Sequence, residues 1–130
     1  MVEVPDDLLY DPNHIWVKEE DGVFVVGWTA FAVQSAGDIA YVTLPRKGTK
    51  IEAGKEFGSI ETGKWVGRLT SPVTGEVIEV NERAMVDPEL VNETPYSEGW
   101  FLRIRSDLGP STKLLSAQEY LEIVKAGKAF

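Results

Sequence analysis

The sequence predicts a mostly β domain, a sandwich or flattened barrel of small antiparallel sheets with short flanking helices. Short strand-like runs recur along the chain, glycine- and proline-containing turns separate them, and the clearest helical pattern lies near the C-terminus. With 130 residues, of which 43% are hydrophobic, the chain is long enough to bury a core. We therefore expect one domain over residues 1–130.

A hairpin is expected near the N-terminus. Residues 1–11 are acidic and contain a proline, and we expect them to lie along the surface. Residues 14–19 and 23–27 have strand-like patterns, and the Asp21-Gly22 pair between them is typical of a tight hairpin turn. The first sheet therefore begins here.

A short helix and a further strand are predicted next. Thr29 can cap a helix over residues 30–36, and Gly37 is typical of the position that ends a helix. Residues 39–44 read as a strand, with the odd-numbered side chains expected on one face and the even-numbered ones on the other. Pro45 begins the turn that ends this strand.

Lys64 is the candidate functional residue, because the pattern around it predicts a hairpin with one amine at its tip. Strand-like residues 57–61 and 65–70 flank Thr62-Gly63-Lys64. A Gly-X pair between two strands is typical of a type II′ turn, in which the glycine has a positive φ. We therefore expect Gly63 and Lys64 at the two central positions, with the lysine in water. Such an amine is well placed for another enzyme to acylate.

The second half of the chain is predicted to hold two further strands and the C-terminal helix. Residues 75–80 and 100–105 alternate as strands. The segment between them contains Pro88 and Pro95, so we expect only one or two short helical turns there. Ser116 and Glu119 have the spacing of a capping box, and Gly127 is expected to end the helix that follows.

Composition excludes several classes of function. The formal charge of −8 disfavours nucleic-acid binding, because phosphates would repel an acidic surface. Without cysteine, the chain has no disulfide, thiolate nucleophile or cysteine metal site. The single histidine, His14, is expected at the surface or at a strand boundary, and no carboxylate cluster has the spacing of a metal site. No membrane-spanning or signal segment is predicted. We expect a cytoplasmic monomer that is not an enzyme.

Several segments resemble the glycine cleavage system H protein family. They are YDPNHIWV, GWTAFAVQSAGDIAYVTLPRKGTKIEAGKEFGSIETGK, SPVTGEVIEVNE, DPELVNETPYSEGW and LLSAQEYLEIV, and together they span nearly the whole chain. The resemblance implies a barrel-sandwich hybrid, two small antiparallel sheets with a C-terminal helix, that serves as a lipoyl domain. It also implies that the protein carries lipoate rather than catalysing a reaction.

The resemblance assigns roles to three residues. Lys64 matches the lysine that carries covalently attached lipoate in the family. Glu61 matches the acidic residue that lipoate-attaching enzymes read, and Gly75 matches a glycine beside the modified hairpin. Without the resemblance, Glu61 would read as an ordinary exposed charge and Gly75 as an ordinary turn glycine.

The loop around Lys64 departs from the family pattern. Gly63 and Trp65 stand where the family usually has valine and alanine, and Ile15 replaces a glutamate. Trp65 adds an aromatic surface that either packs on the hairpin or contacts a partner, and Gly63 is a second possible partner contact. This loop resembles the H-like lipoate-binding proteins of the heterodisulfide-reductase-like sulfur oxidation system.

Three hypotheses follow. In the first, which these substitutions favour, the lipoyl arm on Lys64 serves sulfur oxidation with a heterodisulfide-reductase-like complex. In the second, the chain carries the aminomethyl intermediate between the decarboxylase, the aminomethyltransferase and the dihydrolipoyl dehydrogenase of glycine cleavage. In the third, it is an unmodified interaction scaffold. Both carrier hypotheses require an enzyme that attaches lipoate.

Overall fold

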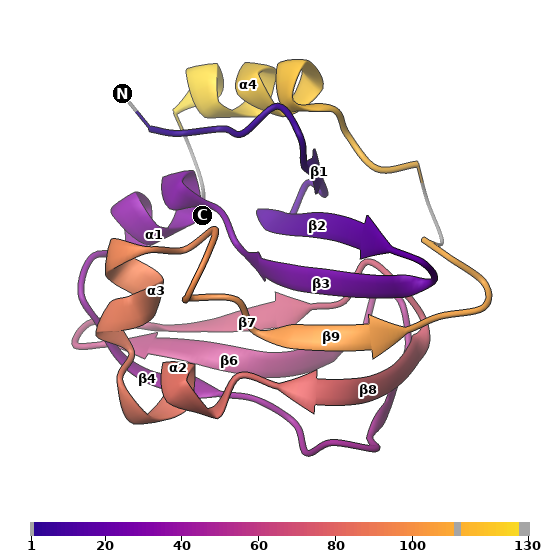
Figure 1. Ribbon diagram of the computed structural model, residues 1–130. Coiled ribbons are helices and arrows are strands. Elements are labelled where there is room, and N and C mark those ends of the chain that lie inside the picture. Colours follow the sequence, from indigo (N-terminus) through magenta and orange to yellow (C-terminus); the bar gives the residue numbers. More distant parts are fainter. Residues whose placement is uncertain (1, 111–112, 128–130) are drawn as a thin grey trace.

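The computed structural model describes residues 2–110 and 113–127, which form two antiparallel sheets and four helices (Figure 1). One sheet has the strand order β1-β2-β3-β9-β8-β5, and the other has the order β4-β6-β7. This confirms the mostly β class with flanking helices, although neither sheet closes into a barrel. The elements are β1 (Leu9–Tyr10), β2 (Ile15–Glu20), β3 (Val23–Trp28), α1 (Ala30–Ala36), β4 (Ile39–Thr43), β5 (Lys50–Ile51), β6 (Glu56–Thr62), β7 (Val66–Thr70), β8 (Gly75–Val80), α2 (Glu82–Val86), α3 (Glu89–Glu93), β9 (Leu102–Arg105) and α4 (Ala117–Ala126).

The hydrophobic core lies between the two sheets. Val26 and Ile104 contribute fully buried side chains from the six-stranded sheet, and Ile60 and Leu69 contribute theirs from the three-stranded sheet. Because side chains alternate along a strand, the residues between these face the opposite side of each sheet, where Trp16 and Val25 of the six-stranded sheet are buried in a second cluster with Tyr120 of α4. The three-stranded sheet therefore covers one face of the larger sheet, and its own other face is the outer one.

The N-terminal segment is more deeply integrated than the sequence predicts. Leu8 and Tyr10 are buried, and β1 (Leu9–Tyr10) pairs with β2, so the end of this segment belongs to the packed fold, with only the Leu9 side chain exposed. Asp21 and Gly22 both have positive φ, which confirms a tight turn between β2 and β3. Two-residue strands such as β1 and β5 are too short to leave a periodic pattern in the sequence.

The predicted alternation of residues 39–44 is wrong at one position, because a register shift separates Ile39 from Tyr41. Ile39 is buried with Val42, whereas Tyr41 points outward. Such a bulge places an extra residue in one strand and turns the following side chains to the other face. The shift leaves Tyr41 on the outer face of the three-stranded sheet.

The helices begin and end where the sequence predicts. The Thr29 side chain accepts a hydrogen bond from the Ala32 N–H, and Gly37 ends α1 with a φ of 84°. Ser116 and Glu119 form the full capping box of α4, and Gly127 follows it in a left-handed conformation. The one or two short helical turns expected in the proline-interrupted segment are α2, before Pro88, and α3, between Pro88 and Pro95.

Candidate functional site

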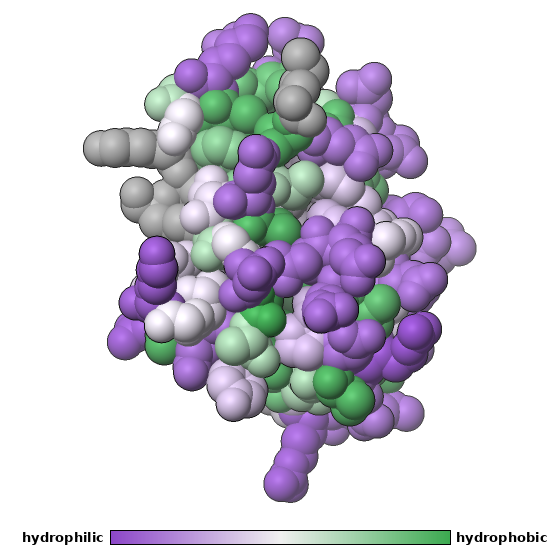
Figure 2. Space-filling view, turned by 90° about the vertical axis from the view of Figure 1, so that its left-hand side faces the viewer, coloured by the Kyte–Doolittle hydropathy of each residue, from purple (hydrophilic) through white to green (hydrophobic). Residues whose placement is uncertain are grey.

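The tip of the β6–β7 hairpin, residues 62–65, lies at one end of the molecule. Glu61 and Val66 form the last strand pair, and beyond them the Thr62 N–H donates to the Trp65 carbonyl at 2.9 Å. Gly63 and Lys64 therefore sit at the apex, and both are exposed. Figure 2 faces this end, where hydrophilic side chains surround smaller hydrophobic areas.

Thr62, rather than Gly63, holds the turn together. Its Oγ1 accepts hydrogen bonds from the backbone N–H groups of Lys64 and Trp65, each at 3.2 Å. Gly63 has no positive φ, so the predicted type II′ turn is wrong. A threonine hydroxyl that bonds to the backbone two and three residues ahead offers an alternative to the glycine turn. The signal for it was present in the sequence, directly before the glycine.

Gly63 is also sterically unnecessary. A Cβ built on this residue would have no heavy atom within 4 Å beyond its chain neighbours. Together with its ordinary φ, this means that a larger residue would fit without a change in the backbone. The substitution at this position therefore gives no sign of an altered turn.

Trp65 packs back onto its own hairpin. Its ring covers Gly67, where an added Cβ would collide with it, and it meets the Trp28 ring edge-on with centroids 6.4 Å apart. The side chain is only partly exposed and adds to the core cluster. Of the two roles predicted for this ring, the structure shows packing on the hairpin.

Glu61 is exposed on β6, directly before the tip. It lies opposite Tyr41 of β4 and Val66 of β7. The structure thus places Glu61 on the outer face of the three-stranded sheet, where solvent reaches it, and Thr62 and Gly63 separate it from Lys64 along the chain. Reasoning from the sequence missed both of its cross-strand neighbours.

Gly75 begins β8, and Figure 1 shows that the start of β8 lies at the end of the molecule opposite the turn between β6 and β7. The chain leaves the tip along β7, turns after Thr70 and enters the six-stranded sheet at Gly75. A Cβ at Gly75 would collide with the Arg105 carbonyl and approach Ile104 Cγ2 to 2.9 Å. The glycine lets β8 approach β9 closely, and the structure does not bring it to the tip.

His14 is buried instead of lying at the surface, in what we call the α4 polar cluster, namely Asp11, His14, Thr29 and Tyr120. The Tyr120 hydroxyl lies 2.8 Å from His14 Nδ1 and 2.7 Å from Thr29 Oγ1. Tyr120 also stacks on Tyr10 at a centroid distance of 4.7 Å. These contacts anchor α4 to the sheet, so the histidine has a structural role.

Asp11 is the second buried titratable group of the cluster. Its Oδ1 accepts the N–H groups of Asn13 and Ile15, each at 2.9 Å. Burial raises the pKa of this carboxyl to about 6, and the two backbone hydrogen bonds oppose the rise. The bonds organise the loop in which His14 takes a φ of 69°. Among the described residues, no group of three or more His, Cys, Asp or Glu could hold a metal ion.

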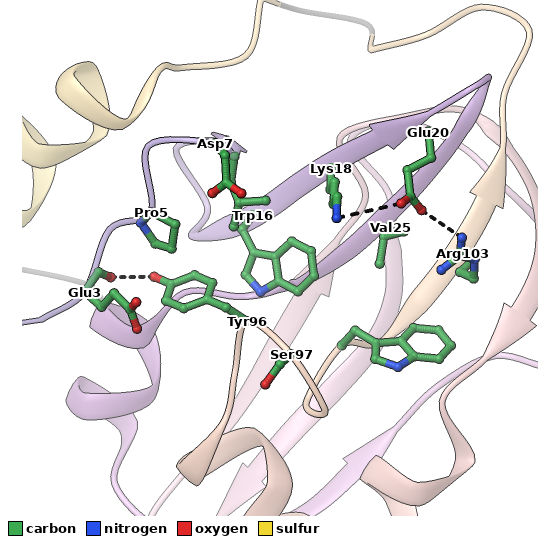
Figure 3. Close-up of a pocket in the computed structure, with 12 residues that line it drawn as sticks. Glu3, Pro5, Asp7, Trp16, Lys18, Glu20, Val25, Tyr96, Ser97 and Arg103 are labelled. Atoms are coloured by element: carbon green, nitrogen blue, oxygen red, sulfur yellow. Dashed lines mark hydrogen bonds and ion pairs between the residues drawn. The ribbon is translucent and has the colours of Figure 1, made fainter.

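The groove in Figure 3 has a volume of about 430 Å³ and contains none of the predicted site residues. Glu20 forms ion pairs with Arg103 at 2.8 Å and with Lys18 at 3.7 Å. The Tyr96 hydroxyl donates to the Glu3 carbonyl at 2.7 Å and so secures the N-terminal segment. Several polar groups of this groove are thus engaged with one another, and none of the predicted site residues lines it.

No helix in the described part of the chain has both the length and the apolar character needed to cross a membrane.

Comparison with known proteins identifies the family. Residues 8–127 match the family of the glycine cleavage H-protein. The glycine cleavage system H protein of Rubrobacter xylanophilus is 47% identical over 120 residues, covering 92% of this chain and 94% of the relative. That of Bacillus cereus is 44% identical over 123 residues, covering 94% and 97%.

A solved structure agrees. The crystal structure of a glycine cleavage system H protein from Mycobacterium marinum superimposes with a TM-score of 0.88 at 33% identity, covering 94% of this chain and 99% of that one. Sequence and fold thus match over nearly the full length of the relatives. The chain belongs to the glycine cleavage H-protein family.

Proposed function

We propose that this protein carries lipoate on Lys64 and serves the glycine cleavage system. Proteins of this family bear lipoate covalently on a lysine and are carriers rather than enzymes. The observation that carries the proposal is the exposed Lys64 at the apex of a hairpin whose turn is held by Thr62. Open surroundings and a rigid base suit an amine that other enzymes must reach.

Attachment would be an acyl transfer to Lys64. The unprotonated Nζ attacks the carbonyl carbon of an activated lipoyl group, the amide C–N bond forms, and the bond to the leaving group breaks with loss of one proton from nitrogen. The lysine loses its charge, so the formal charge of the chain changes from −8 to −9. Lipoate supplies a cyclic disulfide, and the chain, which lacks cysteine, leaves the redox chemistry to it.

The protein contributes by holding Lys64 in a defined position. The Thr62 hydrogen bonds hold the backbone of Lys64 and Trp65, and the Trp65 ring fixes the base of the tip on Gly67. Tethering a reactive group to such a base raises its effective concentration at partner active sites. The net negative charge favours encounter with basic partner surfaces.

The preference for sulfur oxidation gains no support. It rests on Gly63 and Trp65. Gly63 does not have the positive φ that would change the backbone of the turn, and the Trp65 ring is only partly exposed. The relatives with matching sequences are named for glycine cleavage. We therefore place the glycine cleavage enzymes, rather than a heterodisulfide-reductase-like complex, as the partners.

The test uses the full chain after lipoylation, together with glycine decarboxylase and glycine. We expect a glycine-dependent gain of mass on the lipoylated protein, and we expect none on Lys64→Arg, which keeps the charge but is not acylated. Addition of the aminomethyltransferase and tetrahydrofolate is expected to remove the aminomethyl group and to leave the arm in its reduced, dithiol form. A lipoylated protein that shows no glycine-dependent change would exclude glycine cleavage and leave a lipoyl carrier for another system.

A further inference from the structure

Two exposed apolar side chains lie in one cross-strand row with Glu61. Tyr41 of β4 and Val66 of β7 are its Cα partners on either side. Residues directly opposite one another in antiparallel strands project from the same face of the sheet. The structure therefore presents Tyr41, Glu61 and Val66 side by side on the outer face; we call them the tip row.

The tip row is unusual on this surface. Tyr41 is 63% exposed and Val66 is 62% exposed. Among the described residues only three other large hydrophobic side chains are exposed, namely Leu9, Val86 and Leu108. Two of the five thus share one row, and that row adjoins Lys64.

The next row on the same face is polar. It contains Thr43, Ser59 and Arg68, of which Arg68 pairs with Glu56 at 3.5 Å. The apolar exposure is therefore confined to the strand ends nearest the tip. Folding does not require it, because Val42 and Ile60 fill the core from the inner face.

The position of the row indicates which partner would cover it. Before modification, Lys64 offers only its own four-carbon stem, so an acylating enzyme must bring its active site to the tip and lie against the neighbouring strand ends. Once an arm is attached, later partners can reach its end from further away. The surface beside Lys64 therefore faces the attaching enzyme most closely.

The charge of the row indicates the chemistry of that partner. A carboxylate between two apolar side chains becomes partly shielded from water when the row is covered, and it then requires a cationic partner. Once covered, the row would resemble the centre of a protein–protein interface, in which an ion pair is surrounded by apolar groups that exclude water.

We propose that Tyr41 and Val66, which flank Glu61 in the tip row, form with it the docking surface for the enzyme that attaches lipoate to Lys64. The enzyme meets Glu61 with an arginine or lysine and covers Tyr41 and Val66 with apolar side chains. This inference rests on the proposed function, and it assigns to Tyr41 and Val66 a role in selecting the protein for modification.

The test measures initial rates of lipoylation of the full chain by a purified lipoate-attaching enzyme, with lipoate and ATP, followed by intact mass. Tyr41→Thr and Val66→Thr keep β-forming residues on exposed positions. We expect each to raise KM for the carrier protein about tenfold, with kcat nearly unchanged. Tyr41→Phe, which keeps the ring, is expected to have a KM close to that of the protein without a substitution.

Leu108→Thr is the matched control. Leu108 is 80% exposed and lies near Gly75, at the end of the molecule opposite the tip. The lipoylation rate of Leu108→Thr is therefore expected not to change. Equal KM values for Tyr41→Thr, Val66→Thr and Leu108→Thr would overturn the docking surface. Thermal unfolding of each variant shows whether the fold is kept.

An end-point measurement separates this inference from the proposed function. With excess enzyme, both tip-row variants are expected to reach full modification of Lys64, because the amine itself is intact. Failure of the unmodified sequence to accept lipoate at any enzyme concentration would remove the proposed function and the docking surface together. Full modification with unaltered KM in the variants would remove only the docking surface.

Discussion

The hairpin tip and the α4 polar cluster use polar side chains in opposite ways. In the cluster, His14 and Asp11 are buried and hydrogen-bonded, and they anchor α4 and its neighbouring loop. At the tip, Lys64 and Glu61 are exposed. The residue types that often indicate catalysis therefore have structural roles here, whereas the residue that we propose to be functional is a lysine distinguished only by its position.

The contrast predicts that the packed body resists changes which the tip accepts, and two glycines test this directly. Gly75→Val places a Cβ against the Arg105 carbonyl, which cannot move without breaking the contact of β8 with β9. We expect a loss of about 3 kcal/mol in the free energy of unfolding, because overpacking against backbone is not relieved by rotamer changes. Urea unfolding monitored by tryptophan fluorescence measures the loss.

The same substitution at the tip is the control. Gly63→Val meets no heavy atom within 4 Å beyond its chain neighbours, so we expect its stability to match that of the unmodified sequence within about 0.5 kcal/mol. Equal losses at the two glycines would contradict the distinction between body and tip.

The second prediction concerns pH and the buried carboxyl. Burial raises the pKa of Asp11 from its ordinary value of 3.8 to about 6 in the folded protein, so the folded state favours the protonated form. The stability that this provides is complete below pH 3.8 and is lost as the pH rises through 6, a change of about 3 kcal/mol. Asp11→Asn keeps an Oδ1 acceptor for the two backbone N–H groups but does not titrate.

We therefore expect the free energy of unfolding of Asp11→Asn to gain on that of the unmodified sequence as the pH rises from 4 to 7. Other groups titrate in both proteins, so the difference between the two isolates Asp11. A difference that stays constant over this range would show that the carboxyl titrates normally. Lys64 lies outside this cluster, so the lipoylation rates of the two proteins should agree at each pH.

A small effect on stability is expected for the residue that holds the tip. Thr62→Val removes the hydroxyl of a buried side chain that accepts the Lys64 and Trp65 N–H groups, and water can replace this acceptor at the exposed Lys64. We expect a loss of less than about 1 kcal/mol together with a severalfold slower attachment of lipoate, because the amine is less well positioned. Thr70→Val, at the other end of β7, is the control, and equal lipoylation rates would argue against a positioning role for Thr62.

The sequence was sufficient for the parts of the fold with strong local signals. The Asp21-Gly22 turn, the Thr29 and Ser116 caps and the exposed Lys64 all follow from residues close together in the chain. The type of turn at Gly63 was wrong because Thr62 competes for the same backbone groups. That choice depends on a side-chain hydrogen bond, which a strand pattern does not contain.

Features that depend on distant residues were not predictable in the same way. The burial of His14 depends on Tyr120, which lies 106 positions later in the sequence. The exposure of Tyr41 depends on a bulge in β4 and on its register with β6. The place of Gly75, eleven residues from Lys64 by number, depends on which sheet the chain enters after β7. Topology, rather than local pattern, decides each of these.

The central claim is that Lys64 carries lipoate, and it is tested most directly by the intact mass of the protein from its native host, with peptide mapping across residues 57–80. We expect one lipoyl adduct, located on Lys64. An unmodified Lys64 in cells that lipoylate their other carrier proteins would contradict the proposal and leave a folded module without a carrier function.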